Sequence, residues 1–245
     1  MVGARIKRRF VIWLLWVVCF VLCFVLGAVL ASGLLVALQA AGVPWSVETT
    51  VGNLVFRLVT YVFMAGLFAG VPLLLLKRNV LTLEQMGLGR MLRFGDIGLA
   101  LAGVIVYLLI TFFTQYALRF VPGFDGSQTQ DLGISTQLFG SDLLIAYIVL
   151  VILTPLFEEL IFRGMLYAEL RKSQVNQWAA ALVVSVLFGV AHGQWNVGVD
   201  VFCMSMVACY LREMTGTIWP GVVLHILKNA VAFWFVFIAA QSMTG

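Results

Sequence analysis

The segment Phe157-Glu158-Glu159-Leu160-Ile161-Phe162-Arg163-Gly164 decides how this chain can fold. It places two adjacent acids and an arginine within the predominantly apolar stretch between Leu143 and Leu170. In lipid, each of these charges would cost about 2.5–3.5 kcal/mol even on a lenient insertion scale. A membrane helix that carries three charges must direct them toward partners or toward water. The segment therefore predicts a buried polar site inside a membrane protein.

The composition supports this interpretation. Of the 245 residues, 62% are hydrophobic and only 11% are charged, whereas a soluble domain is about half apolar and a quarter charged. We therefore expect an all-α, polytopic membrane protein with about seven transmembrane helices, and the lipid bilayer is its first partner. The net charge of +4 comes from basic residues at segment ends, which indicates membrane topology. No nucleic-acid partner is expected.

Apolar stretches and the polar breaks between them predict seven spans, at residues 10–39, 53–76, 97–118, 142–172, 177–192, 197–211 and 218–239. Residues 81–92 form a partly amphipathic piece that we expect at the membrane interface. The first stretch is too long for the apolar region of a signal peptide, so we interpret it as an uncleaved helix.

Basic residues fix the expected orientation of the spans. They precede the first span and recur at 77–93, at 171–172 and at Arg212, which fall on one side when the spans alternate. The positive-inside rule places that side, and the N-terminus with it, in the cytoplasm. The polar segment 122–140 and the C-terminus are then expected outside. We expect an integral protein of a prokaryotic plasma membrane.

Four polar positions in the C-terminal half need an explanation. Glu159 and Arg163 are spaced i, i+4 with the acid first, which favours a helical ion pair and leaves Glu158 unmatched. The only two histidines of the chain, His192 and His225, both lie in apolar helices. A single histidine in such a helix is usually a packing residue. Two of them together with an unmatched acid favour a functional site.

The depths of these residues agree with one another. Glu158 and His192 each lie about 16–17 residues from the turn near Val175, or about 25 Å at the rise of an α-helix. An antiparallel hairpin would place them opposite each other, and His225 lies at a compatible depth in the last span. The sequence therefore predicts one polar cluster within the bilayer.

Three motifs now stand in order along the chain: Glu158-Glu159-x-x-x-Arg163, Phe188-x-x-x-His192 and His225-x-x-x-Asn229. Together they resemble the motifs of the CPBP family, the CAAX-protease and bacteriocin-processing (Abi) family of intramembrane proteases. The resemblance covers residues 143–234. It divides the chain into N-terminal transmembrane helices with the interfacial segment (1–140) and a catalytic transmembrane core (141–245).

The resemblance implies an intramembrane endopeptidase of the CAAX prenyl protease 2 type, acting on a peptide or membrane-protein substrate. Peptide hydrolysis needs an activated water, a stabilised oxyanion and a proton for the leaving amine. Glu158 is the candidate base, and His192 could hold the water or shuttle its proton. His225 and Asn229 could donate hydrogen bonds to the oxyanion. The resemblance implies that Glu159 and Arg163 hold the first motif in place. Phe188 is expected to bind substrate.

A metal ion is the main alternative within this chemistry. Glu158, His192 and His225 offer ligands suited to a catalytic zinc with an open position. However, the sequence has no His-Glu-x-x-His helix, and the asparagine of the third motif would be an uncommon ligand. We therefore favour a metal-free glutamate mechanism without a cofactor, although the resemblance fits both.

Two other function classes remain open. One is a bacteriocin-immunity or binding protein of the same fold that shields the cell from a peptide without cutting it. The other is a transporter or proton pathway in which the acids and histidines form a relay. The relay is disfavoured because the sequence shows no paired, interrupted helices of the inverted-repeat type.

Overall fold

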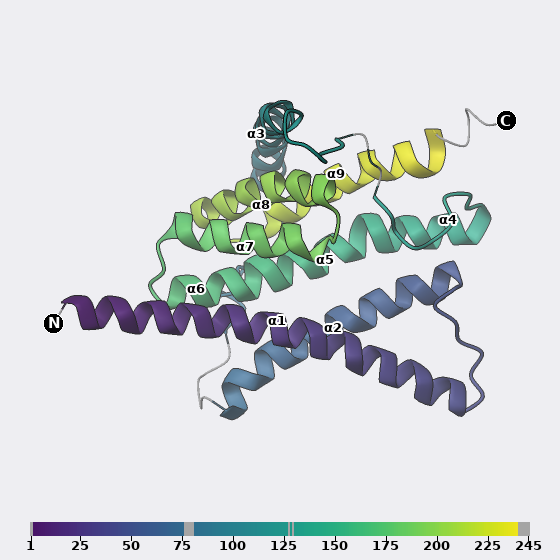
Figure 1. Cartoon of the computed structure of the whole chain (residues 1–245), viewed down its shortest axis with the longest axis horizontal. Coiled ribbons are helices and arrows are strands. Elements are labelled where there is room, and N and C mark those ends of the chain that lie inside the picture. The colour runs from purple at the N-terminus through teal and green to yellow at the C-terminus, as the bar shows by residue number, and fades with distance from the viewer. Residues whose placement is uncertain (1, 76–80, 127, 129, 240–245) are drawn as a thin grey trace. The chain divides into compact units, whose positions relative to one another are not determined.

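The computed structural model describes residues 2–75, 81–126, 128 and 130–239 (Figure 1). No strand occurs within those ranges, so the prediction of an all-α protein is confirmed there. Two predicted features lie outside the described residues: the basic pair Lys77 and Arg78, and the C-terminal residues 240–245. The elements are α1 (Val2–Ala40), α2 (Thr50–Leu75), α3 (Phe94–Leu118), α4 (Gly140–Tyr147), η1 (Ile148–Leu153), α5 (Thr154–Glu159), η2 (Leu160–Tyr167), α6 (Ala168–Lys172), α7 (Gln177–Ala191), α8 (Trp195–Thr215), α9 (Trp219–Phe233) and η3 (Trp234–Ala239).

Each of the seven predicted spans matches a helix of the described chain to within a few residues at most ends. Five segments are long and apolar enough to cross a membrane: Val11–Ala40, Thr50–Gly70, Phe94–Leu118, Gly140–Lys172 and Trp219–Ala239. The polytopic membrane fold is thereby confirmed. The other two predicted spans correspond to α7, which is apolar but has only 15 residues, and to α8, which carries Asp200, Arg212 and Glu213. Residues 81–92 form turns, and their location at the membrane interface stays a prediction.

The helix Gly140–Lys172 contains two π-helical stretches, η1 and η2. The second begins at Leu160, directly after the two adjacent acids. π-Helical turns are rare, and they are found disproportionately at functional sites. An apolar pattern with a period of 3.6 residues does not predict them, so the sequence alone gave no sign of this wider winding.

The chain divides into two compact units, each assembled from separated stretches. The first contains Met1–Trp13, Leu81–Asp131 and Glu159–His225, and we call it the histidine unit because it holds both histidines. The second contains Leu14–Val80, Leu132–Glu158 and Ile226–Gly245, and we call it the Glu158 unit. The predicted functional boundary at residue 140 stays a prediction.

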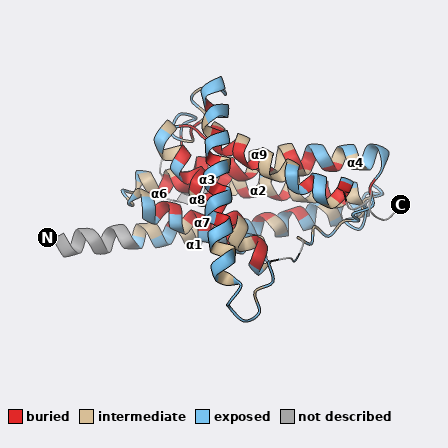
Figure 2. Cartoon of the chain, turned by 90° about the horizontal axis from the view of Figure 1, so that it is seen from above, coloured by how far each residue is buried: buried red, intermediate tan, exposed pale blue. Residues whose placement is uncertain are grey.

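Within the histidine unit, α7 and α8 pack side by side (Figure 1). The two helices come close at two glycines: a Cβ on Gly189 would lie 2.7 Å from the carbonyl oxygen of Gly198. Farther along, the buried hydroxyls of Ser185 and Ser205 hydrogen-bond at 2.7 Å. Small residues let membrane helices approach closely in this way. Helix α3 packs on α8 and is otherwise exposed along most of its length (Figure 2).

The glycine contact yields a prediction with a matched control. Gly189→Ala should lower the free energy of unfolding by about 1–3 kcal/mol, because the added methyl group meets backbone that cannot rotate away. Gly98→Ala on α3 should instead be neutral or stabilise by up to about 1 kcal/mol, since nothing lies within 4 Å of a Cβ there. Thermal unfolding in detergent micelles measures both, and equal effects would contradict the close helix contact.

The Glu158 unit has its own apolar core. Trp16 and Phe20 of α1 contact Phe68 of α2, with ring centroids 5.6 and 5.5 Å apart. A second buried cluster joins α2, the start of the long helix and the end of α9; it consists of Leu54, Leu138, Ala146, Val149, Val151, Phe233 and Phe237. Arg57 of α2 donates to the carbonyl oxygen of Leu132 at 2.5 Å, which ties α2 to the loop before α4.

Candidate active site

The ion pair that the i, i+4 spacing predicts is present in the histidine unit. Glu159 and Arg163 are both 0% exposed, and Arg163 Nη1 lies 2.9 Å from Glu159 Oε1. The guanidinium nitrogens make no well-aligned hydrogen bond to any described atom. Instead, the guanidinium carbon lies 4.7 Å from the centroid of the Phe188 ring. The buried positive charge is therefore balanced by one carboxylate and one aromatic face.

The carboxylate of Glu159 also orients His225. His225 is buried, and its Nδ1 lies 3.1 Å from the same Oε1 atom that contacts Arg163. The other oxygen, Oε2, would lie 2.9 Å from a Cβ on Gly221 of α9, so glycine at this position leaves room for the acid. This contact fixes the orientation of the His225 ring, with Nδ1 toward Glu159.

His192 is held in a similar way by backbone. It caps the C-terminus of α7, and its Nδ1 lies 2.8 Å from the carbonyl oxygen of Phe188. A carbonyl can only accept a hydrogen bond, so Nδ1 carries the proton in this contact. Both imidazoles are thus fixed through Nδ1, one by a carboxylate and the other by a carbonyl.

The ring of Phe188 is the centre of this cluster. It is completely buried and makes edge-on contacts with Phe162, His192 and His225 at centroid distances of 4.8, 4.9 and 5.7 Å. These contacts position both imidazoles. The expected role of Phe188 in substrate binding stays a prediction, because every contact of its ring described here is to a side chain of its own unit.

The Glu158 unit holds the other two motif residues. Glu158 is 7% exposed, and its Oε1 accepts a hydrogen bond of 2.5 Å from the hydroxyl of Tyr61 on α2. Asn229 of α9 donates from Nδ2 to the carbonyl oxygen of Leu150, in the first π-helical stretch, at 2.9 Å. This bond orients the Asn229 amide, whose Nδ2 carries a second N–H.

Tyr61 was not predicted from the sequence. The only signal was a phenolic hydroxyl in the middle of an apolar span, which must find a partner when buried. Its ring also stacks on Phe157, with centroids 6.1 Å apart, so two contacts hold it beside the motif. Tyr61 is therefore a candidate positioning residue for the Glu158 carboxylate.

We expect Tyr61→Phe to lower kcat by about tenfold, because a hydrogen bond to a charged group is worth about 1.5–3 kcal/mol. KM should change less than twofold, since the hydroxyl faces the carboxylate. Tyr116→Phe, on an exposed position of α3, is the control. Steady-state cleavage rates would reveal the split, and a change confined to KM would contradict a positioning role.

The histidine unit therefore brings together five of the seven predicted site residues: Glu159, Arg163, Phe188, His192 and His225. The other two, Glu158 and Asn229, belong to the Glu158 unit. The three candidate zinc ligands, Glu158, His192 and His225, are divided between the units in the same way. The predicted convergence of all these groups on one water stays a prediction.

Comparison with known proteins now adds to this geometry. The sequence model of a family described as type II CAAX prenyl endopeptidase Rce1-like matches residues 140–231, a segment that contains all three motifs. This segment belongs to the CAAX-protease family. The family match begins where the long motif helix begins and ends two residues after Asn229.

A further comparison is with a curated relative. Over 108 residues, the chain is 28% identical to an Escherichia coli protein named "Uncharacterized 24.3 kDa protein". The match covers 41% of this chain and 50% of the relative, so the chain spans about half the length of the curated relative it matches. No solved structure matches the chain.

Proposed function

We propose that the protein is an intramembrane endopeptidase that hydrolyses a peptide bond in a membrane-associated protein or peptide. One observation carries the proposal. Within the segment that matches the CAAX-protease family, two imidazoles are held through Nδ1, at Glu159 and at the Phe188 carbonyl. Histidines that only filled space in an apolar helix would not need both rings to be oriented by hydrogen-bond acceptors in this way.

In the proposed mechanism, Glu158 takes a proton from a water molecule whose oxygen attacks the scissile carbonyl carbon. His225 and Asn229 donate hydrogen bonds to the oxyanion, and His192 holds the attacking water. When the carbon–nitrogen bond breaks, Glu158 returns the proton to the leaving amine. Glu159 and Arg163 act as positioning residues, because Glu159 contacts His225 and Arg163 pairs with the same carboxylate and holds it in place.

The substrate class and location belong to the same proposal. The acid and the imidazoles lie in apolar helices, so the substrate must reach them from the membrane or its surface. We further propose that the protein lies in a prokaryotic plasma membrane with its N-terminus in the cytoplasm, as the basic segment ends indicate.

A comparison of protein termini in membranes tests the function. Membranes that contain the wild-type protein should show new peptide termini that are absent when Glu158→Gln replaces it. Identical termini would overturn the proteolytic function. If Glu158→Gln also protected cells from a bacteriocin as well as the wild type does, the immunity function would take its place.

A zinc-dependent version of the protease is the second candidate, and the imidazole contacts favour it specifically. Histidines that bind a metal usually donate their other ring N–H to a carboxylate or a backbone carbonyl, as His225 and His192 can do here. Glu158, His192 and His225 would hold such an ion, which would supply an activated water.

Removal of zinc with a chelator distinguishes the metal-free mechanism from the zinc-dependent one. We expect the purified protein to keep its full cleavage rate after dialysis against a strong zinc chelator, because the proposed mechanism uses Glu158 alone to activate water. A known zinc peptidase treated in parallel is the control. Loss of cleavage that added zinc restores would contradict the metal-free mechanism.

A further inference from the structure

A basic pocket lies in the histidine unit at the end of the long motif helix. It has a volume of about 310 Å³ and is lined by three cations, Arg171, Lys172 and Arg212, and by one acid, Glu213. The candidate membrane span Gly140–Lys172 ends at this pocket. The end of a transmembrane span lies near the depth of the lipid phosphates, because the headgroups begin where the hydrocarbon core ends.

The acid in the pocket is fully engaged with its neighbours. Arg171 donates to Glu213 from Nε at 3.0 Å and from Nη2 at 2.6 Å, and the hydroxyl of Tyr167 donates to it at 2.8 Å. A third nitrogen of Arg171, Nη1, donates to the carbonyl oxygen of Val175 at 2.6 Å. Glu213 and Arg171 therefore neutralise each other, which leaves the positive charge of Lys172 and Arg212 in the pocket.

Arg212 makes no ion pair within the described part of the chain, although it is partly buried. Its Nη2 donates to the carbonyl oxygen of Gln85 at 2.8 Å, and its buried Nε has no hydrogen-bond partner there. Lys172 is 39% exposed and lies 3.9 Å from the nearest oxygen of Glu169, a long contact for an ion pair. Glu213 attracts Arg212 through space, but the hydrogen bonds of Glu213 go to Arg171 and Tyr167. A further anion from outside the chain would therefore stabilise the partly buried guanidinium.

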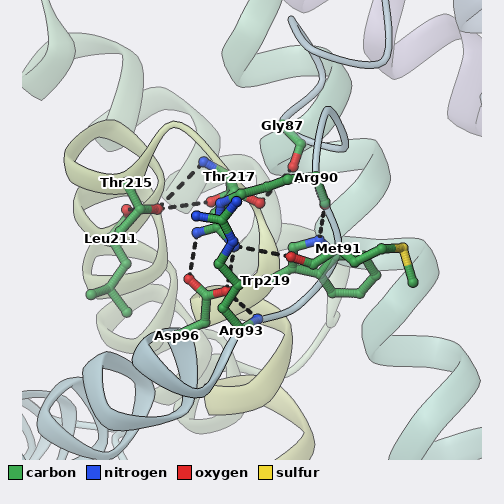
Figure 3. Close-up of polar contacts among 9 residues, drawn as sticks. All are labelled: Gly87, Arg90, Met91, Arg93, Asp96, Leu211, Thr215, Thr217 and Trp219. Atoms are coloured by element: carbon green, nitrogen blue, oxygen red, sulfur yellow. Dashed lines mark hydrogen bonds and ion pairs between the residues drawn. The ribbon is translucent and has the colours of Figure 1, made fainter.

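The segment before α3 forms one wall of the pocket and is held in place by hydrogen bonds. Leu81 and Gln85 line it, and the loop that follows them is tied to the turn between α8 and α9. Figure 3 shows that turn: Thr217 donates to the carbonyl oxygen of Gly87 at 2.7 Å, and the Trp219 indole donates to that of Arg90 at 2.7 Å.

An ion pair and a glycine further define the path of this loop. Arg90 forms two hydrogen bonds of 2.6 and 2.7 Å with Asp96 (Figure 3), and these bonds raise the pKa of the Arg90 guanidinium. Gly87 has a φ of +78°, and a Cβ there would lie 2.8 Å from Arg212 Nε. Only glycine lets the loop pass so close to the guanidinium, and the carbonyl oxygen of Gln85 accepts from Arg212 Nη2, so this segment holds Arg212 at the pocket without supplying a negative charge.

We propose that this pocket binds a phosphate group, carried by an anionic lipid or free in solution. Basic pockets between transmembrane helices are suited to phosphate-bearing headgroups, and Arg and Lys both bind phosphate oxygens well. The proposal rests on Arg212, Lys172 and the fixed loop, and it does not depend on proteolysis.

Lipid binding by the purified full chain tests the proposal. The midpoint of thermal unfolding in micelles is measured against the mole fraction of phosphatidylglycerol, with diacylglycerol, which lacks the phosphate, as the matched lipid. A parallel series uses inorganic phosphate against chloride at equal ionic strength. Protection by phosphatidylglycerol alone identifies a lipid headgroup, and protection by inorganic phosphate identifies a soluble ligand. Protection by neither overturns the proposal.

Substitution of the two pocket cations tests whether the ligand binds at this pocket. Lys172→Gln and Arg212→Gln should each weaken the apparent affinity for the protecting ligand by about fivefold, since a basic residue near a membrane surface is worth about 1 kcal/mol. Arg119→Gln, which removes an exposed arginine after α3, should bind as the wild type does. Lys172→Gln carries the test if Arg212→Gln does not fold. Unchanged affinity in Lys172→Gln and in any folded Arg212→Gln would overturn the proposal.

Discussion

Glu158→Gln is expected to lower kcat/KM for peptide cleavage by about 10²–10⁴-fold, the range typical of a general base. The amide keeps the size of the side chain and can still accept a hydrogen bond from Tyr61, but it cannot take a proton from water. The substrate is one identified by the comparison of peptide termini in membranes. Its cleavage rate is measured with purified protein in micelles.

The matched control for this variant is Glu84→Gln, which removes an exposed carboxylate from the loop before α3. It should cleave at the wild-type rate. Both proteins should unfold at the same temperature as the wild type to within a few degrees, which would show that any loss is chemical. Cleavage by Glu158→Gln at the wild-type rate would remove this acid from the mechanism.

Arg163→Met should give the largest loss of stability of any single change considered. The substitution leaves Glu159, which is 0% exposed, without the cation that balances its charge. Breaking a buried pair by removing one partner typically costs about 3–5 kcal/mol. Thermal unfolding in micelles and the amount of folded protein in membranes both measure this effect. Arg119→Met, at an exposed position, is the control and should leave stability unchanged.

The double variant Glu159→Gln with Arg163→Met separates stability from function. It removes the buried charge together with its partner, so it should recover much of the stability that Arg163→Met loses. The double variant should not recover cleavage, because the amide that replaces the Glu159 carboxylate presents no charge to His225. Wild-type stability in the Arg163→Met protein would contradict the account of this ion pair.

The sequence predicts most of the fold because apolar length and polar breaks decide where a membrane helix begins and ends. The long motif helix was predicted at 142–172 and is found at Gly140–Lys172. Features that depend on tertiary packing were not predicted. The π-helical stretches follow no sequence period, and the contact of Gly189 with Gly198 joins two glycines that are unremarkable when read along the chain.

The site was predictable where spacing along one helix decides the contact, as for Glu159 with Arg163. It was not predictable where the contact depends on how separate helices meet. Both His225 with Glu159 and Tyr61 with Glu158 are contacts of this second kind. The contact of Phe188 with His192 follows from their i, i+4 spacing on α7, whereas its contact with His225 depends on how α7 and α9 meet.

The central claim is that Glu158 and His192 serve the same step, and the double variant Glu158→Gln with His192→Ala tests it most directly. Residues that act as one unit are strongly non-additive, so losing either should cost nearly as much as losing both. We predict that kcat/KM of the double variant equals that of the more damaged single variant to within a few-fold. Losses that multiply in the double variant would show that the two groups act independently, and the account would be wrong.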